Sequence, residues 1–309
     1  MTNAPLIKLI PQHLEKIWAG SRLSAWYHHT STLPIGEVWC VSTLDAHPSL
    51  LSGTDLILRD VLKANPDRFP LPNGELPYRI TLIDAAQPLS VQIHPDQAYA
   101  DRMGLESGLS EAWVVLKTTG PAELVLGHHA ASSEDLHQEI NDGHWDRLLH
   151  RVKSMPLHWV FIPGAMLHAI GAGNLIYEIS ERPDVTYRLY DYDRLDVSTG
   201  KPRPLHRKEA LSLIQVPQIN PPQLHPFPET SDNPQVLLER PGKFGIKKVD
   251  SAPTLNLETW GFLTVLGGKG TLSGTPIALG DTVLVGRDQV QCSCSGSWWG
   301  LYAYLPEES

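Results

Sequence analysis

Short apolar runs, many of them alternating with polar residues, follow one another along the chain and are separated by glycine and proline. Alternation with a period of two is typical of a β-strand with one buried face. The 26 prolines and 24 glycines among 309 residues divide the chain into short segments, as in all-β sandwiches and barrels. We expect strands at residues 35–44, 78–84, 88–94, 111–118, 122–126, 157–163, 175–180 and 185–190, with 111–118 and 122–126 forming a pair. The pattern therefore predicts a mainly β protein.

Three segments depart from this period and favour helices. Residues 54–62 form a short apolar pattern, and residues 96–104 fit one or two helical turns. Residues 132–151 begin with a serine that can cap a helix and carry acidic residues in the first turn, which suits the helix dipole. We expect a small helical insertion around 132–151.

Residues 216–235 are rich in proline and lack apolar periodicity, which is typical of an extended connector. We therefore expect residues 1–215 to form one domain, which includes the helical insertion, and residues 236–309 to form a second β-barrel. The run from Gly268 to Gly286 has the pattern of two hairpins and contains no histidine. We expect this second barrel to be free of metal.

The composition argues against several classes of protein. The formal net charge of −9 disfavours a nucleic-acid partner and an anionic membrane surface, although a cleft can still attract an anionic substrate. The apolar stretches are too short to span a membrane, and the N-terminal segment lacks the continuous apolar core of a signal peptide. The cysteine count of three, an odd number, argues against a disulfide framework. We expect a cytoplasmic protein.

Four residues form the first indication of chemistry. Gln92 and His94 stand two apart in a predicted strand, so their side chains share a face and can bind one ion. A proline directly after His94 ends that strand and holds His94 at the mouth of a barrel. Glu111 begins an apolar run, and His168 lies in apolar company after a glycine turn. These four side chains can hold one divalent metal; for His168 the alternative is a hydrogen-bonded histidine of the core.

Longer motifs resemble those of a known family. They are GEVWCVS, LIDAAQPLS, LSVQIHPDQAYA, HAIGAGNLIYEI and DVTYRLYDYDR. In order and spacing they are similar to the type I mannose-6-phosphate isomerases (phosphomannose isomerases) in their short bacterial form. The resemblance runs from about Lys16 to His206 and, more loosely, through the C-terminal segment. It implies a double cupin, that is, two jelly-roll β-barrels, with one zinc ion per chain. It also implies that the small-molecule partner is a sugar phosphate. We expect the protein to be a monomer or a homodimer.

The resemblance also implies roles for individual residues. The metal positions of the family match Gln92, His94, Glu111 and His168. The catalytic arginine of the family's TYR motif matches Arg188, and the acidic residue of the LIYEI strand matches Glu178. The positions that line the family's pocket match Trp18, Glu37 and Ser90.

Two positions depart from the family's pattern. Thr81 and Leu109 stand where relatives usually carry pocket lysines. Each charge-assisted hydrogen bond to a phosphate can contribute roughly 1.5–3 kcal/mol, so the loss matters. Arg79 lies two residues before Thr81 and in a strand would point to the same face. A pocket arginine there can bind phosphate bidentately but moves protons poorly because its pKa is high; the alternative is an exposed strand arginine.

Aldose–ketose isomerisation moves hydrogen between C1 and C2, usually through a cis-enediol. Zinc would act as a Lewis acid, and Arg188 would place a fixed positive charge beside the enediolate. The sequence leaves Glu178, Glu37 and a water at the metal open as the base. The resemblance thus predicts a zinc-dependent interconversion of mannose 6-phosphate and fructose 6-phosphate. Because two lysines are replaced, two alternatives stay open: a non-catalytic sugar-binding or regulatory cupin, or an isomerase for a different sugar.

Overall fold

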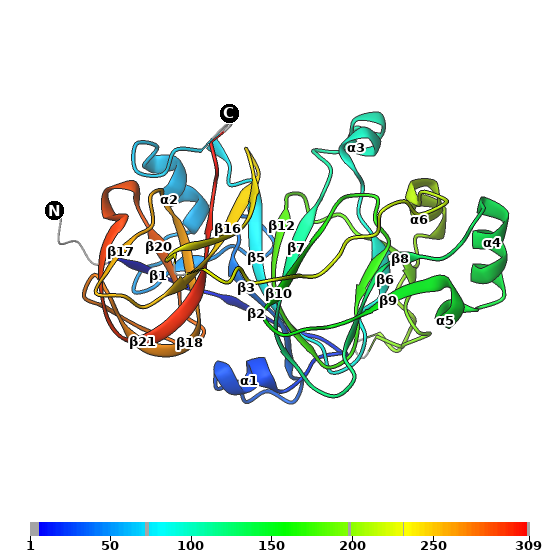
Figure 1. Ribbon diagram of the computed structural model, residues 1–309, viewed down its shortest axis with the longest axis horizontal. Coiled ribbons are helices and arrows are strands. Elements are labelled where there is room, and N and C mark those ends of the chain that lie inside the picture. Colours follow the sequence, from blue (N-terminus) through cyan, green and yellow to red (C-terminus); the bar gives the residue numbers. More distant parts are fainter. Residues whose placement is uncertain (1–5, 72–73, 197–198, 231, 308–309) are drawn as a thin grey trace.

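Three antiparallel β-sheets form the framework of the protein, which confirms the prediction of a mainly β fold (Figure 1). The computed structural model describes residues 6–71, 74–196, 199–230 and 232–307. Two sheets form the unit on the right of Figure 1, and the third sheet forms the unit on the left. No helix within these described ranges has the length and apolar character needed to cross a membrane.

The right-hand unit consists of a seven-stranded and a five-stranded sheet. The first has the order β14-β10-β7-β12-β5-β3-β2 and the second the order β13-β6-β11-β8-β9. The strands of the first are β2 (Gln12–Glu15), β3 (Ile35–Val41), β5 (Tyr78–Asp84), β7 (Glu111–Thr118), β10 (His158–Ile162), β12 (Asn174–Glu181) and β14 (His225–Pro226). Those of the second are β6 (Val91–Ile93), β8 (Glu123–His128), β9 (Leu149–Lys153), β11 (His168–Ile170) and β13 (Tyr187–Tyr190). Apolar residues of both sheets share one buried cluster, so the sheets pack face to face.

The left-hand unit is built on a nine-stranded sheet with the central order β15-β16-β21-β18-β20-β1-β4. Its strands are β1 (Ile7–Ile10), β4 (Leu50–Leu51), β15 (Gln235–Arg240), β16 (Phe244–Asp250), β17 (Thr254–Asn256), β18 (Gly261–Leu272), β19 (Thr275–Ala278), β20 (Thr282–Val285) and β21 (Gln291–Tyr304). The N-terminal strand β1 pairs with β20, so the start of the chain joins the sheet of the C-terminal strands. The domain boundaries at 215 and 236 stay a prediction.

The helices are short and lie at the edges of the sheets (Figure 1). They are α1 (Arg22–Trp26), α2 (Leu58–Ala64), α3 (Gln97–Met103), α4 (Ser133–Asn141), α5 (Trp145–Leu148), α6 (Arg207–Leu213) and the 3-10 turn η2 (Arg287–Gln289). The helix predicted at 54–62 begins later, at Leu58, because the preceding residues form a turn and an isolated bridge. The segment 132–151 holds α4 and α5 but ends in strand β9. Ser132 caps α4 as predicted, by accepting a bond from the backbone N–H of Asp135.

The strands at 111–118 and 122–126 exist, but the predicted pairing between them is wrong. β7 pairs with β10 and β12, whereas β8 pairs with β9 and β11. The short connection between them carries the chain from one sheet to the facing sheet, and alternation alone does not distinguish that path from a hairpin.

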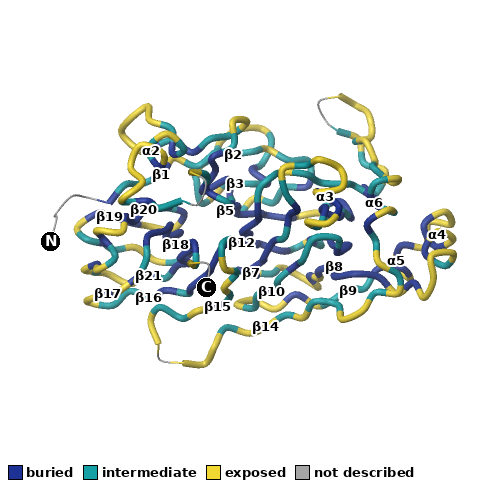
Figure 2. Tube along the Cα trace, turned by 90° about the horizontal axis from the view of Figure 1, so that it is seen from above, coloured by how far each residue is buried: buried dark blue, intermediate teal, exposed yellow. Residues whose placement is uncertain are grey.

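Strand β5 shows how the alternating pattern positions the site. Tyr78, Ile80 and Leu82 belong to a core that also contains apolar residues of the left-hand unit. Arg79 and Thr81, on the opposite face, line a cavity between the two sheets of the right-hand unit. Figure 2 shows the same division, with buried residues concentrated in the strands and exposed ones in α4 and the loops. A pair of polar side chains is therefore held on a strand whose other face is fixed in the core.

Candidate active site

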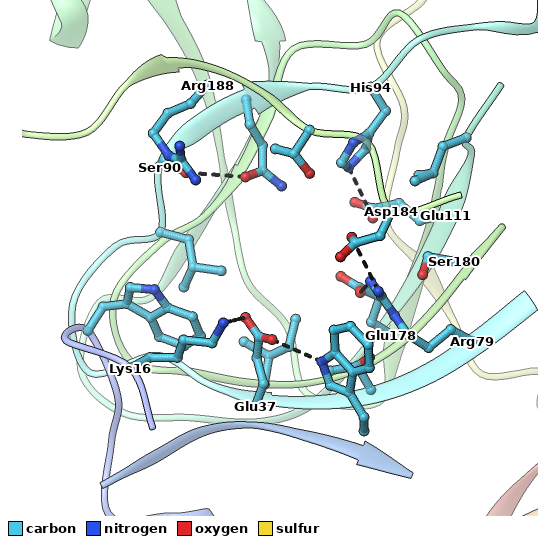
Figure 3. A pocket seen from close by; sticks show the side chains of 18 of the residues that line it. Lys16, Glu37, Arg79, Ser90, His94, Glu111, Glu178, Ser180, Asp184 and Arg188 are labelled. Carbon is cyan, nitrogen blue, oxygen red and sulfur yellow. Dashed lines mark hydrogen bonds and ion pairs between the residues drawn. The ribbon is translucent and has the colours of Figure 1, made fainter. Parts of the chain in front are cut away.

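A cavity of about 340 Å³ lies between the two sheets of the right-hand unit (Figure 3). Its lining is mostly polar and charged, although it sits among apolar strands. Every residue predicted from the sequence except His168 lines it: Trp18, Glu37, Arg79, Ser90, Gln92, His94, Glu111, Glu178 and Arg188. His168 lies beside it and contacts Gln92 and Glu111. The structure thus brings together residues that are up to 170 positions apart in the sequence.

Three candidate ligands form one buried cluster. His94 follows β6, Glu111 begins β7, and His168 begins β11. One ligand atom from each lies within 4.8 Å of the others. The Nε2 atoms of His94 and His168 are 3.5 and 3.4 Å from the two carboxylate oxygens of Glu111. The cluster therefore joins the two facing sheets at one point.

Backbone carbonyls fix which imidazole nitrogen faces the cluster. The Nδ1 atoms of His94 and His168 donate to the carbonyls of Val185 and Met166, each over 2.8 Å. Burial lowers the pKa of His168 to about 4, so its imidazole is neutral near pH 7. Each Nε2 therefore directs a lone pair at the centre of the cluster, as a metal ligand does. His94 Nε2 and Glu111 Oε1 are buried and have no hydrogen-bond partner.

Gln92 completes the set. It pairs across the strands with His168, and its amide Nε2 is 3.4 Å from His168 Nε2, while its Oε1 accepts a 3.2 Å bond from Ser90. A half-turn of the amide exchanges its oxygen and nitrogen and directs the oxygen to the cluster. Two imidazoles, a carboxylate and an amide oxygen form a nitrogen–oxygen donor set that fits zinc. A bound metal ion would also give a partner to the buried His94 Nε2 and Glu111 Oε1 atoms.

Glu178 of β12 lines the cavity, and a residue of the neighbouring strand β7 holds its carboxylate. It stands between Thr81 of β5 and Trp113 of β7 in one row across the sheet. Trp113 Nε1 donates a 3.1 Å hydrogen bond to Glu178 Oε2. Burial, together with the charge of Glu111, raises the pKa of Glu178 well above its ordinary value, and Arg79 opposes this in part. Glu178 is therefore a stronger base than an exposed glutamate.

Arg79 lies in the cavity and not on the exposed side of its strand. Its guanidinium is 3.2 Å from Asp184 and 3.9 Å from Glu178, and it stacks on Trp39 with 4.1 Å to the ring centroid (Figure 3). Asp184 therefore offsets its positive charge, and Glu178 lies near the same guanidinium.

Lys16 is a pocket residue that the sequence reasoning missed. It follows β2, and its Nζ is 3.2 Å from Glu37 Oε1, across the cavity from the cluster in Figure 3. Trp39 Nε1 holds the other oxygen of Glu37 at 3.0 Å. A Cβ atom on Gly36 would lie 2.5 Å from Lys16 Cβ, so only glycine lets the lysine stem cross the strand here. The available signal was that the resemblance begins at about Lys16.

Arg188 lies on β13, directly opposite Gln92 of β6. Its Nη1 donates to the carbonyl of Pro204 over 3.1 Å, and its Nε is buried without a partner. Two further residues that the sequence reasoning missed, Arg203 and His206, lie in the segment beside it and also line the cavity. They come from an irregular segment, where periodicity gives no information about direction.

The two positions that depart from the family's pattern both line the cavity. Leu109 is buried, and the Thr81 hydroxyl is buried without a hydrogen-bond partner. Neither supplies a charge, so the positive groups of this cavity come from other positions.

The fold and the cluster define a cupin-type protein with a candidate metal site. Residues 6–109 match the family described as phosphomannose isomerase type I, catalytic domain. The chain is 35% identical over 230 residues to mannose-6-phosphate isomerase ManA of Bacillus subtilis (strain 168), covering 73% of this chain and 72% of the relative. It is also 35% identical over 213 residues to mannose-6-phosphate isomerase of Streptococcus mutans serotype c, covering 65% of each chain. The chain belongs to the type I phosphomannose isomerase family.

Solved structures agree with this fold. A crystal structure of the mannose 6-phosphate isomerase from Bacillus subtilis superimposes with a TM-score of 0.85 at 26% identity, over 98% of this chain and all (100%) of the other. A structure of mannose 6-phosphate isomerase bound with zinc and yttrium gives a TM-score of 0.72 at 17% identity, over 98% of this chain and 100% of the other. That second likeness concerns the fold alone.

Proposed function

We propose that the protein is a zinc-dependent isomerase that interconverts mannose 6-phosphate and fructose 6-phosphate. The observation that carries the proposal is the buried cluster of His94, Glu111 and His168, which opens on a cavity lined by Glu178 and Arg188. The substrate is inferred from the names of the relatives, and the cavity contains side chains suited to the isomerisation.

Gln92, His94, Glu111 and His168 would hold the metal. A bound zinc ion would supply Lewis acidity to the sugar's oxygens at C1 and C2. The two imidazoles would bind through Nε2, because each Nδ1 is held by a backbone carbonyl, that of Val185 or Met166. The carboxylate of Glu111 offsets only one of the two positive charges of the ion.

Glu178 is the proposed base. It takes the proton from C2 of the open-chain aldose, O1 gains a proton, and the cis-enediol forms. The hydroxyl proton of O2 then leaves as Glu178 returns its proton to C1, so the ketose forms with no net gain or loss of protons. Trp113 holds one oxygen of Glu178, which leaves the other for the substrate. Trp18, Glu37, Ser90 and Arg79 would shape the rest of the substrate pocket.

Arg188 would stabilise the negative charge that develops on the enediolate oxygens. Its place opposite Gln92 puts its strand position beside the candidate metal ligands, and its half-buried guanidinium keeps its charge at any working pH. Because its guanidinium stays protonated, Arg188 cannot act as the base.

Thr81 and Leu109 favour two other candidates: a cupin that binds a sugar without turning it over, and an isomerase for a different sugar. A coupled assay on zinc-loaded protein, converting mannose 6-phosphate to fructose 6-phosphate, separates these candidates. We expect turnover that the Glu178→Gln variant lowers by roughly 100-fold or more, the scale of general-base catalysis. Zinc-loaded, folded wild-type protein without turnover would overturn the isomerase assignment.

A further inference from the structure

The cations of the cavity differ in how far their charge is already offset. In the part of the chain that the structure describes, four lysine or arginine side chains line it: Lys16, Arg79, Arg188 and Arg203. Arg79 faces two carboxylates and Lys16 faces one, Glu37. Both are poorly placed to attract a further anion without losing a partner.

In the segment after β13, positively charged side chains outnumber the carboxylates that they contact. Burial and the nearby charges of Arg203 and Arg194 lower the pKa of Arg188, and the carboxylate of Asp191 opposes this in part. Arg194 and Arg203 both donate to Asp191 Oδ1, over 2.5 and 2.6 Å, whereas Arg188 donates to the neutral carbonyl of Pro204. One carboxylate thus serves two guanidinium groups, and Arg188, which lines the cavity with Arg203, forms no ion pair among the described residues. These contacts leave an excess of positive charge beside the cavity.

Asp191 fixes the direction of Arg203. It is buried, with 4% of its surface exposed, and it accepts bonds from Arg203 Nε over 2.7 Å and Nη2 over 2.6 Å. This two-point pairing leaves Arg203 Nη1 outside the ion pair and holds the planar guanidinium in one orientation. A cation that is already ordered loses little conformational entropy when it binds a ligand.

The same segment is tied to the proposed reacting end. The backbone N–H of Arg188 donates to His206 Nδ1 over 3.1 Å, and the N–H of His206 donates to the carbonyl of Arg188 over 2.7 Å. Arg188 lies opposite Gln92, and Arg203 lies three residues before His206. A sugar with its C1–C2 end at the cluster can therefore extend toward Arg203.

We propose that Arg203, held by Asp191, binds the phosphate dianion of the substrate, in a cavity where Thr81 and Leu109 supply no charge. This inference rests on the proposed function and adds the residue that selects a phosphorylated sugar. Arg203 is a specificity-determining residue, and Asp191 is its positioning residue.

The test compares Arg203→Met with Arg151→Met, which removes a half-buried arginine from its pair with the exposed Asp146 outside the cavity. We expect Arg203→Met to raise KM for mannose 6-phosphate tenfold or more while kcat stays within about threefold. Competitive inhibition by inorganic phosphate should weaken by a similar factor. Slow turnover of unphosphorylated mannose should keep its kcat/KM, and Arg151→Met should change none of these quantities.

Each outcome decides a separate question. An active wild-type enzyme whose KM and phosphate inhibition survive Arg203→Met would overturn the inference and leave the proposed function standing. A wild-type protein without turnover would overturn the proposed function; calorimetric binding of mannose 6-phosphate to wild type and variant would then decide the role of Arg203. Should Arg203→Met not fold, Arg203→Lys keeps the charge but not the two-point pairing. Its KM for mannose 6-phosphate should rise at least threefold, and an unchanged KM would count against the inference.

Discussion

Trp113 and Glu178 stand opposite each other on neighbouring strands, and the indole Nε1 donates a 3.1 Å hydrogen bond to one carboxylate oxygen. Trp113 is itself almost fully buried and packs edge-on against His168, with 5.6 Å between ring centroids. One side chain therefore contacts both the proposed base and a proposed metal ligand. The orientation of Glu178 depends on this contact, since its backbone alone does not fix its last torsion.

Trp113→Phe tests this positioning role, because phenylalanine keeps an aromatic ring but lacks the N–H group. We expect kcat for mannose 6-phosphate to fall roughly tenfold, the scale of one hydrogen bond to a charged group, while zinc content is kept. Trp298→Phe is the control, since that buried indole has no hydrogen-bond partner. Equal activity of the two variants would show that Glu178 does not need the bond.

Glu178→Gln should stabilise the metal-free protein while it strongly lowers turnover. Burial and the charge of Glu111 raise the pKa of Glu178, so above the ordinary value of 4.5 the unfolded chain releases a proton that the folded chain retains. The carboxyl therefore lowers stability increasingly as pH rises from about 4.5 toward its folded pKa. At pH 7 we expect the variant to gain on the order of 1 kcal/mol in the free energy of unfolding.

Urea unfolding of both metal-free proteins at pH 7 and pH 4 measures this difference. The gain should shrink toward pH 4, where the carboxyl is protonated in both states. A variant less stable than wild type at pH 7 would contradict the assigned direction of the pKa.

The sequence predicted the strands that carry the site better than it predicted their partners. The alternation at 78–84 defines β5 to the residue, and the period of two correctly puts Ser90, Gln92 and His94 on one face, where all three line the cavity. Alternation is a local property, so it could not show that β7 and β8 belong to different sheets. The order of strands depends on contacts between distant residues.

The residues of the candidate site likewise fall into those that the sequence predicted and those that it did not. Residues inside regular strands, such as Glu111 and Arg188, were found from motif and periodicity, and the structure brings them to the cavity. Lys16, Arg203 and His206 come from irregular segments, so no periodicity predicts their direction. Arg79 was predicted to share a face with Thr81, and it does, but its partners Asp184 and Trp39 follow only from the tertiary packing.

Loss of a proposed ligand should remove the metal. We expect Gln92→Ala and His168→Ala each to weaken zinc binding by more than the 10–100-fold that is usual for residues behind the ligands. Elemental analysis after dialysis against a weak chelator measures the zinc content, with His137→Ala, an exposed histidine of α4, as the control. Undiminished zinc in both ligand variants would place the metal elsewhere.

Gly36→Ala should act on the enzyme through Lys16. A Cβ atom at position 36 would lie 2.5 and 2.6 Å from Lys16 Cβ and Cγ, so the lysine stem must move and its contact with Glu37 must break. Arginine cannot exchange protons near neutral pH, and Lys16 is the one lysine that lines the cavity among the described residues. We expect Gly36→Ala and Lys16→Met to lower kcat/KM by a similar factor, roughly tenfold, with little further loss in the double variant.

The double variant tests whether Gly36 acts through Lys16. Residues that act through one interaction give non-additive effects, whereas independent residues give effects that multiply. Lys63→Met, which removes a lysine paired with Glu75 away from the cavity, is the matched control. Losses that multiply in the double variant would show that Gly36 acts on something other than Lys16.

Asp191→Asn should lower stability in a manner that depends on pH. Burial by itself would raise the pKa of Asp191, but hydrogen bonds from Arg203 and Arg194 outweigh burial and lower the pKa below its ordinary value of 3.8. A carboxyl with a lowered folded pKa contributes stability that is complete above the ordinary value and is lost as pH falls through the folded value. We expect the variant to lose about 1–3 kcal/mol at pH 7, because two guanidinium groups lose a charged acceptor.

The comparison at low pH separates this ion pair from a simple loss of packing. Asparagine has nearly the shape of aspartate, so the difference between wild type and variant should shrink below pH 3.8 as Asp191 itself becomes neutral. Asp146→Asn removes the exposed partner of Arg151 and should change stability by less than about 0.5 kcal/mol at either pH. Urea unfolding at pH 7 and pH 3 gives both quantities. A loss of equal size at the two pH values would mean that Asp191 stabilises the segment through its shape, and the orientation of Arg203 would then need another cause.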